Sequence, residues 1–309
     1  MPGGKPRDQS GAALPRYERK PDQPEALRDG TAWVVNAARP DVRSSTLMND
    51  VWLWPVTCRA HETRRADRVL GDPFAPHLAA SRGEERFGAQ ADSLASFALA
   101  VGVAIIDEVL QHAVVDYHIH TIAGLGAGLD TRPYRLELPR DLRWIEADRA
   151  PVLDYKVLRM AHVAPYCQVR HVSADLSGAA GRRDVLPKIA KDVTRGLVLT
   201  EGLRCTWTHK ALDDLLQRLP PVFGYWIADT IASPPDESAA ALDDNSAAGP
   251  SVVQPEDVPE TFERHGWRVA QFHSLTEQAV RLGADRTAEL LAKRPPGELE
   301  GVWFFRRAT

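Results

Sequence analysis

Three glycines at alternating positions, Gly124, Gly126 and Gly128, interrupt an apolar run and are followed by the acid Asp130. Such a run is typical of a buried strand that turns directly into a helix. Glycine adopts positive φ without strain and has no Cβ, so the backbone N–H groups of this turn can come close to a ligand. We therefore expect the turn to bind an adenine-type cofactor.

The spacing of the glycines narrows the choice of cofactor. In the dinucleotide-binding pattern G-x-G-x-x-G, a turn that begins at Gly124 would place its third glycine at position 129. That position is Leu129, and the glycine comes one residue early, at Gly128. The mismatch favours S-adenosylmethionine over NAD.

An acidic residue ends the next strand-like run, residues 142–148. Asp148 lies about one strand-turn-helix-strand unit after the glycines, which is the position expected of an acid that binds ribose hydroxyls. Glu146 alternates onto the same side of this strand and is the alternative candidate.

Two further runs also end in acids. Residues 168–176 end at Asp175 and Leu176, where a carboxylate suits the exocyclic amine of adenine, and residues 196–203 carry Glu201. In open α/β sheets ligands bind outside the carboxyl ends of the strands, where these acids would converge. Each acid alone could be an ordinary helix cap or turn residue, but the ordered set predicts a cofactor site.

The chain resembles the leucine carboxyl methyltransferase family in three blocks, which are Gly-Ala-Gly-Leu-Asp-Thr-Arg at 126–132, Glu-Ala-Asp-Arg-Ala-Pro-Val-Leu-Asp-Tyr-Lys at 146–156 and Thr-Glu-Gly-Leu at 200–203. Within this family it looks most like the bacterial polyketide-type O-methyltransferases similar to the tetracenomycin carboxyl methyltransferase. Residues 59–75 resemble the N-terminal signature of that branch. The resemblance covers roughly residues 30–230 and, more weakly, the C-terminus.

The resemblance implies a site for S-adenosylmethionine. Its parts would be the glycine loop at the methionyl part, Asp148 at the ribose, Asp175 and Leu176 at the adenine, and Glu201 at the amino-acid end.

The chain departs from the family at two points. The family commonly has an arginine just before the Ile-Asp of the helix that leads into the first strand, where it pairs with the cofactor carboxylate. Residues 100–107 end in Ile-Asp and hold no arginine, so either another cation, with Arg59 the candidate, takes the carboxylate or the pocket has drifted. The aromatic residue usual after Glu-Gly-Leu is replaced by Thr206, although Trp207 is adjacent.

The implied fold is α/β, a class I methyltransferase with a Rossmann-like seven-stranded sheet, helices on both faces and an N-terminal helical lid. We expect strands at 119–125, 143–148, 168–174, 196–201, about 223–229, 267–273 and 301–307, the last two forming an antiparallel end, and helices at 31–62, 90–115 and 255–265. The expected divisions are a disordered arm over 1–28, a helical lid and acceptor region over 29–115, and the cofactor-binding α/β domain over 116–309, compact with the lid.

Composition restricts the partners and the compartment. The net charge of −4 with mixed signs gives no preference for polyanions, so nucleic acid is not an expected partner.

The apolar run 97–106 is about half a membrane span and is better explained as a buried helix. Cys58, Cys167 and Cys205 have no paired spacing, which indicates free thiols in the cytoplasm. The loose stretch 233–254 is either a lid or a disordered insertion.

The acceptor decides what catalysis requires. A carboxylate is ionised at neutral pH and needs no base, whereas a hydroxyl would need one, with His61 or His209 as candidates. Arg204 and Trp207 are candidate acceptor contacts.

We therefore expect an S-adenosylmethionine-dependent O-methyltransferase that acts on a carboxylate, or secondly a hydroxyl, of a small natural product. The alternatives are a methyltransferase-fold enzyme that catalyses a cyclisation or rearrangement, and a non-catalytic small-molecule binder. No metal is expected, because the pair His118 and His120 has no third ligand nearby in sequence.

Overall fold

The computed structural model describes residues 50–203, 207–231, 253–283, 285–293 and 299–308. All of them fall within one compact unit of the chain. The predicted arm over 1–28, the first part of the predicted helix 31–62 and nearly all of the loose stretch 233–254 lie outside the described residues.

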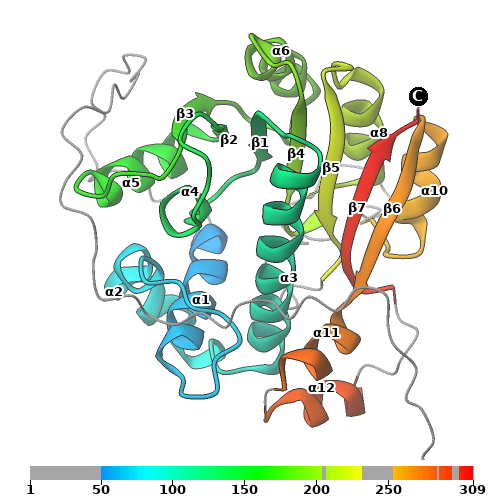
Figure 1. Ribbon diagram of the computed structural model, residues 1–309. Helices are drawn as coiled ribbons and strands as arrows, with labels where there is room; N and C mark the ends of the chain where they lie inside the picture. Colours follow the sequence, from blue (N-terminus) through cyan, green and yellow to red (C-terminus); the bar gives the residue numbers. More distant parts are fainter. Residues whose placement is uncertain (1–49, 204–206, 232–252, 284, 294–298, 309) are drawn as a thin grey trace, which may run out of the picture. The chain divides into compact units, whose positions relative to one another are not determined.

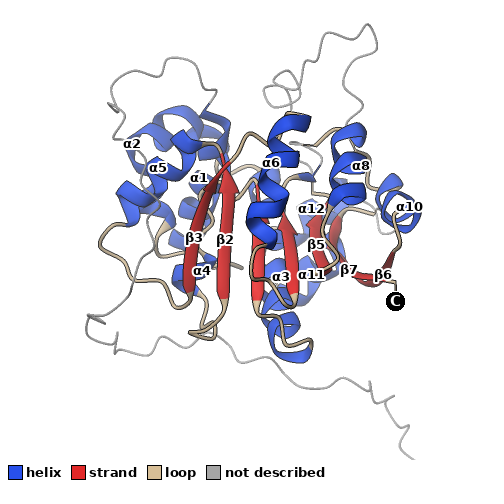
Figure 2. Cartoon of the chain, turned by 90° about the horizontal axis from the view of Figure 1, so that it is seen from above, coloured by secondary structure: helices blue, strands red, loops and turns tan. Residues whose placement is uncertain are grey.

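The described residues form a seven-stranded sheet in the order β3-β2-β1-β4-β5-β7-β6 (Figures 1 and 2). The strands are β1 (Thr121–Leu125), β2 (Arg143–Asp148), β3 (Gln168–Ser173), β4 (Gly196–Thr200), β5 (Phe223–Asp229), β6 (Trp267–Ser274) and β7 (Gly301–Arg307). The first five are parallel, and β7 runs antiparallel to both β5 and β6. The predicted fold class and its antiparallel end are confirmed, and each strand begins and ends within two residues of its predicted position.

The central strands read as apolar runs because helices cover both of their faces. Every residue of β1 and of β4 is buried. Their parallel register pairs Ala123 with Ile145 on one side and with Val198 on the other. The ends of β2 and β4 therefore flank the end of β1, where the glycines begin.

Two helical layers enclose the sheet (Figure 2). One layer holds α6 (Ala179–Ala190), α8 (His209–Arg218) and α10 (Asp257–Arg264); the other holds α3 (Leu94–Asp116), α11 (Leu275–Leu282) and α12 (Thr287–Lys293). By length and composition α3 could cross a membrane, but 67% of its most apolar window is buried inside the protein. The predicted buried helix is thus confirmed, and it begins four residues late because the Ser93 side chain caps it by accepting from the Ser96 N–H.

The remaining helices are labelled in Figure 1. They are α1 (Leu53–Arg64), which follows a 3₁₀ turn at Asp50–Trp52, α2 (Ala75–Phe87), the short α4 (Arg132–Arg135) and α5 (Ala150–Met160). Side chains of α1 and α2 share an apolar cluster with Leu129 of the glycine loop and with Val152 and Met160 of α5. The N-terminal helices are therefore packed directly against the loop that we expect to bind the cofactor.

Candidate cofactor site

The glycine loop has the backbone geometry that only glycine adopts readily. Gly126 and Gly128 have φ values of 71° and 51°. The Gly126 N–H donates to the Ala147 carbonyl at 2.8 Å, which ties the loop to β2. A Cβ built on Gly126 would meet no atom within 4 Å, so open space lies over the loop. Gly124 is less constrained, because its Cβ would make only an ordinary contact with Ala127 at 3.5 Å.

Asp148 joins this loop to the end of β2. Its Oδ2 accepts a hydrogen bond from the Gly128 N–H at 2.7 Å, and its Oδ1 accepts one from the Arg149 N–H at 2.7 Å. Burial raises the pKa of Asp148, and the two N–H groups oppose that shift. Each oxygen keeps acceptor capacity for a further donor, as a ribose-binding acid requires.

Glu146, the alternative acid on β2, has a different environment. It is fully buried, is ion-paired with Lys156, which is also fully buried, and lies 3.1 Å from His171 Nε2. A buried lysine therefore occupies one oxygen of this carboxylate, and a half-buried histidine lies beside the other. Glu146 is the register partner of Gly124 on the neighbouring strand, but of the two carboxylates it is that of Asp148 that accepts a hydrogen bond from the glycine loop.

The other predicted acids lie on either side of the loop, as the strand order requires. Asp175, beyond β3, is exposed, and the Ser177 hydroxyl donates to it at 2.6 Å and lowers its pKa. Leu176 is buried in the core. Glu201 follows β4 on the opposite side of β1, where burial raises its pKa and the charges of Arg132 and Arg59 oppose the shift. Ligands of open sheets bind at such a reversal of strand order.

A buried arginine that the sequence did not single out connects these parts. Arg132 has a side chain only 1% exposed; its Nε donates to Asp107 at 2.7 Å, and its Nη1 is ion-paired with Asp130 at 3.2 Å and with Glu201. Arg135 is paired with the same Asp107. The sequence does place an arginine in the turn after the glycine loop. Its ion-pair partners could not be predicted, because they are far apart in the sequence.

Arg59 of α1 also reaches the glycine loop. Its Nε donates to Asp72 at 2.9 Å and its Nη2 to the Leu129 carbonyl at 2.7 Å. The structure thus brings the segment 59–75 together with the block 126–132, both of which resemble the family. Asp72 in turn accepts from the Thr131 hydroxyl at 2.7 Å, within the loop that follows the glycines.

Asp229, at the end of β5, is a further acid that the sequence analysis missed. It accepts from the N–H groups of Gly202 at 2.7 Å and Leu203 at 3.3 Å, and so holds the turn that carries Glu201. Burial and the nearby charge of Glu201 raise the pKa of Asp229 to about 7. The sequence signal that could have identified Asp229 is its position as an acid at the end of the fifth predicted strand.

The residues predicted for catalysis and for acceptor contacts have surroundings different from those of the predicted cofactor-binding acids. His61 Nε2 lies 2.7 Å from Glu84 on α2, and His209 Nε2 lies 3.4 Å from Asp257 on α10. Trp207 is 3% exposed and packs in the core with α8. Arg204 lies outside the described residues.

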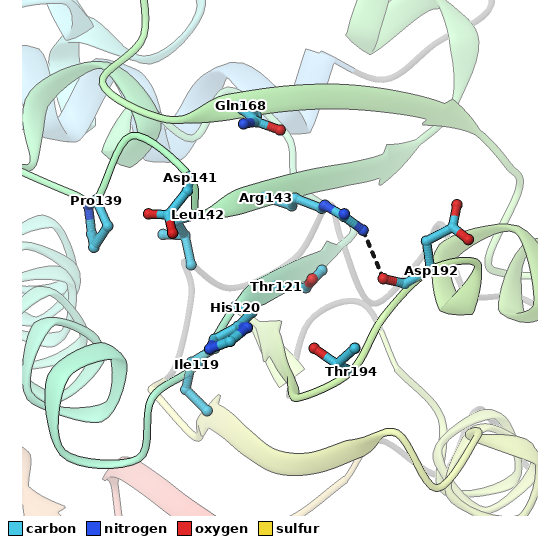
Figure 3. A pocket seen from close by; sticks show the side chains of 10 residues that line it. All are labelled: Ile119, His120, Thr121, Pro139, Asp141, Leu142, Arg143, Gln168, Asp192 and Thr194. Atoms are coloured by element: carbon cyan, nitrogen blue, oxygen red, sulfur yellow. Dashed lines mark hydrogen bonds between the residues drawn. The ribbon is translucent and has the colours of Figure 1, made fainter.

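A cavity of about 390 Å³ lies at the opposite edge of the sheet, where the strands begin (Figure 3). His120 lines it, together with Arg143, whose Nη1 donates to the Asp192 carbonyl at 2.6 Å. No group of three His, Cys, Asp or Glu side chains within the described ranges could hold a metal ion. This cavity is separate from the glycine loop.

The fold and the glycine loop together define the class of protein. A seven-stranded sheet with an antiparallel end, a glycine loop after β1 and an acid at the end of β2 form the architecture of a class I methyltransferase. The leucine carboxyl methyltransferase family model matches residues 53–219, a little over half of the chain, and the chain belongs to this family.

Bacterial relatives are similar in sequence over most of their length. The chain is 28% identical over 248 residues to a Streptomyces coelicolor protein provisionally named an S-adenosyl-L-methionine-dependent methyltransferase. The aligned region covers 73% of this chain and 84% of that protein. A Streptomyces avermitilis protein with the same provisional name is 27% identical over 268 residues, covering 79% and 91%.

Two solved structures are similar to this chain at low sequence identity. A DUF574 family protein from Streptomyces avermitilis has a TM-score of 0.47 at 14% identity, covering 82% of this chain and 97% of that one. Human N-acetylserotonin methyltransferase in complex with its cofactor has a TM-score of 0.38 at 14% identity, covering 82% and 67%.

Proposed function

We propose that this protein transfers the methyl group of S-adenosylmethionine to an oxygen of a small natural product in the cytoplasm, a carboxylate in the first place and a hydroxyl in the second. The observation that carries the proposal is the hydrogen bond from the Gly128 N–H to Asp148, beside the open space over Gly126. The resemblance of residues 59–75 to the polyketide-type branch supports the natural-product acceptor.

The residues at the loop fit this cofactor. Asp148 would accept hydrogen bonds from the ribose hydroxyls, Asp175 and Leu176 would contact the adenine, and Glu201 would face the amino group. Arg59 is the cation proposed for the carboxylate. When bound, S-adenosylmethionine supplies a methyl group that its positively charged sulfur already activates. The protein then has to orient the acceptor and exclude water.

The choice of acceptor rests on the available bases. A carboxylate acceptor needs no base, and both histidine candidates, His61 and His209, lie beside acids on α2 and α10. Asp229 supports the hydroxyl alternative, because its pKa of about 7 would suit a general base.

The test has two stages. Calorimetry with S-adenosylhomocysteine asks whether the purified protein binds the cofactor, and absence of binding would overturn the proposal. Mass spectrometry of co-purified small molecules then guides a panel of carboxylate and hydroxyl acceptors, assayed with methyl-labelled cofactor. Label that alkali releases as methanol identifies an ester, whereas alkali-stable label identifies an ether. Cofactor binding with no transfer to any acceptor would favour the non-methylating alternative.

A further inference from the structure

Asp72, in the segment between α1 and α2, is a buried carboxylate with an unusually complete set of donors. It is 0% exposed. Its Oδ2 accepts from Arg59 Nε at 2.9 Å and from the Thr131 hydroxyl at 2.7 Å, while its Oδ1 accepts from the N–H groups of Phe74 and Ala75. The two oxygens thus have separate tasks, since Oδ1 caps α2 and Oδ2 joins α1 to the glycine loop.

The same carboxylate fixes the guanidinium of Arg59. Burial alone would raise the pKa of Asp72, but the charges of Arg59 and Arg135 lower it below its usual range, so the carboxylate stays ionised. Arg59 Nε is held by Asp72 and Nη2 by the Leu129 carbonyl. Among the hydrogen bonds of the described residues, none uses the third nitrogen, Nη1.

The guanidinium of Arg59 also has a defined place in the site. On one side it bonds to Leu129 in the glycine loop, and its charge acts on Glu201 at the end of β4. It therefore contacts the loop proposed to face the methionyl part of the cofactor, and it is near enough to Glu201, proposed at the amino-acid end, to affect the pKa of that acid. A long arginine side chain loses rotamer freedom when it is fixed, and here it is fixed before any ligand arrives.

We infer that Asp72 is a positioning residue, which holds Arg59 so that its Nη1 meets the carboxylate of the cofactor's amino-acid end. The inference rests on the proposed function, because it assumes S-adenosylmethionine as the ligand. Asp72 itself is 0% exposed and acts only through Arg59.

The test compares two ligands that differ only at the amino-acid end, S-adenosylhomocysteine and methylthioadenosine. Asp72→Asn can keep the oxygen that caps α2 while it replaces the oxygen that receives Arg59 with an NH₂ group. We expect its affinity for S-adenosylhomocysteine to fall about tenfold, the scale of a charge-assisted hydrogen bond, and its affinity for methylthioadenosine to change less than about twofold. Calorimetry gives both values.

Two further variants separate positioning from general support. Thr131→Val removes the other donor to Oδ2 without touching Arg59, and the ratio of the two affinities should stay at the wild-type value. Arg59→Met combined with Asp72→Asn should lose no more affinity for S-adenosylhomocysteine than Arg59→Met alone. Parallel losses for both ligands, or additive losses in the double variant, would overturn the inference.

If Asp72→Asn is too unstable to purify, Arg59→Lys poses the same question from the other partner. Lysine keeps the charge but lacks the planar fork that bonds to Asp72 and Leu129 together. A selective loss of S-adenosylhomocysteine affinity supports positioning, and unchanged affinity overturns it. Failure of the proposed function would look different, because the wild-type protein would then bind neither ligand.

Discussion

The charged side chains at the two edges of the sheet differ in their burial and in their partners. At the edge where the parallel strands end, the side chains of Arg59, Arg132 and Arg135 are at most 6% exposed, and each is paired with a carboxylate. At the edge where the strands begin, His120 and Arg143 are exposed, and Arg143 bonds to a main-chain carbonyl (Figure 3).

The difference shows why a cavity alone does not identify a site. Moving charges out of water is costly, so a buried ionic network persists only if its members are well paired. Here the network surrounds the glycine loop, and its charges are oriented before a ligand binds. At the other edge, the exposed side chains of His120 and Arg143 that line the cavity are solvated and can reorient. Four predictions test this contrast, from the largest expected effect to the smallest.

Removal of the central cation should damage the network most. Arg132→Met would leave Asp107, Asp130 and Glu201 without their shared partner in a buried environment. We expect the free energy of unfolding to fall by about 3–5 kcal/mol in urea denaturation. A loss below about 1 kcal/mol would mean that the network is far more hydrated than its burial indicates.

The second prediction separates the two acids of β2. Asp148→Ala should weaken binding of S-adenosylmethionine by about 1–3 kcal/mol in calorimetry, because a charge-assisted hydrogen bond is lost. Glu146→Gln is the matched control, since it disrupts the pair with Lys156 and should lower stability while the folded protein keeps its affinity. Unchanged affinity in Asp148→Ala would refute the ribose role.

The third prediction concerns pH. The pKa of Asp229 is raised by burial from 3.8 to about 7, so the unfolded chain releases this proton first as the pH rises. The contribution of Asp229 to stability therefore falls between about pH 4 and pH 7 and is constant above that range. Asp229→Asn can still accept from Gly202 and does not titrate.

We therefore expect the Asn variant to gain stability relative to wild type across this range, by the order of 1–3 kcal/mol at pH 8. Urea denaturation at pH 4, 6 and 8 measures the difference. A difference that does not depend on pH would show that Asp229 titrates near its ordinary value in the folded protein.

The smallest effect is expected at the opposite edge of the sheet. Arg143→Ala removes an exposed side chain whose hydrogen bond is to the Asp192 carbonyl. Stability should change by less than about 0.5 kcal/mol, and the affinity for S-adenosylmethionine should not change. A clear loss of cofactor affinity would break the contrast between the edges and would make the cavity in Figure 3 part of the functional site.

Much of the fold could be predicted from the sequence because local signals and burial agree. Strands covered on both faces are short apolar runs, and β2, β5 and β7 begin and end at their predicted residues. The helix α2 was missed, since it has charged and small residues at many positions. Tertiary contacts support it instead, among them the hydrogen bond from the Tyr155 hydroxyl to the Leu78 carbonyl.

By itself the sequence determined the glycine loop, the acids at the strand ends and the family, because each is a local pattern whose chemistry does not depend on distant residues. Only the tertiary structure distinguished the surroundings of Asp148 from those of Glu146, since both point to the same side of β2, but Lys156 of α5 pairs with Glu146 and the Gly128 N–H donates to Asp148. It also revealed the pairing of Arg132 with Asp107 and Glu201. Ion pairs have no sequence period, and which charges meet is decided when the helices pack against the sheet.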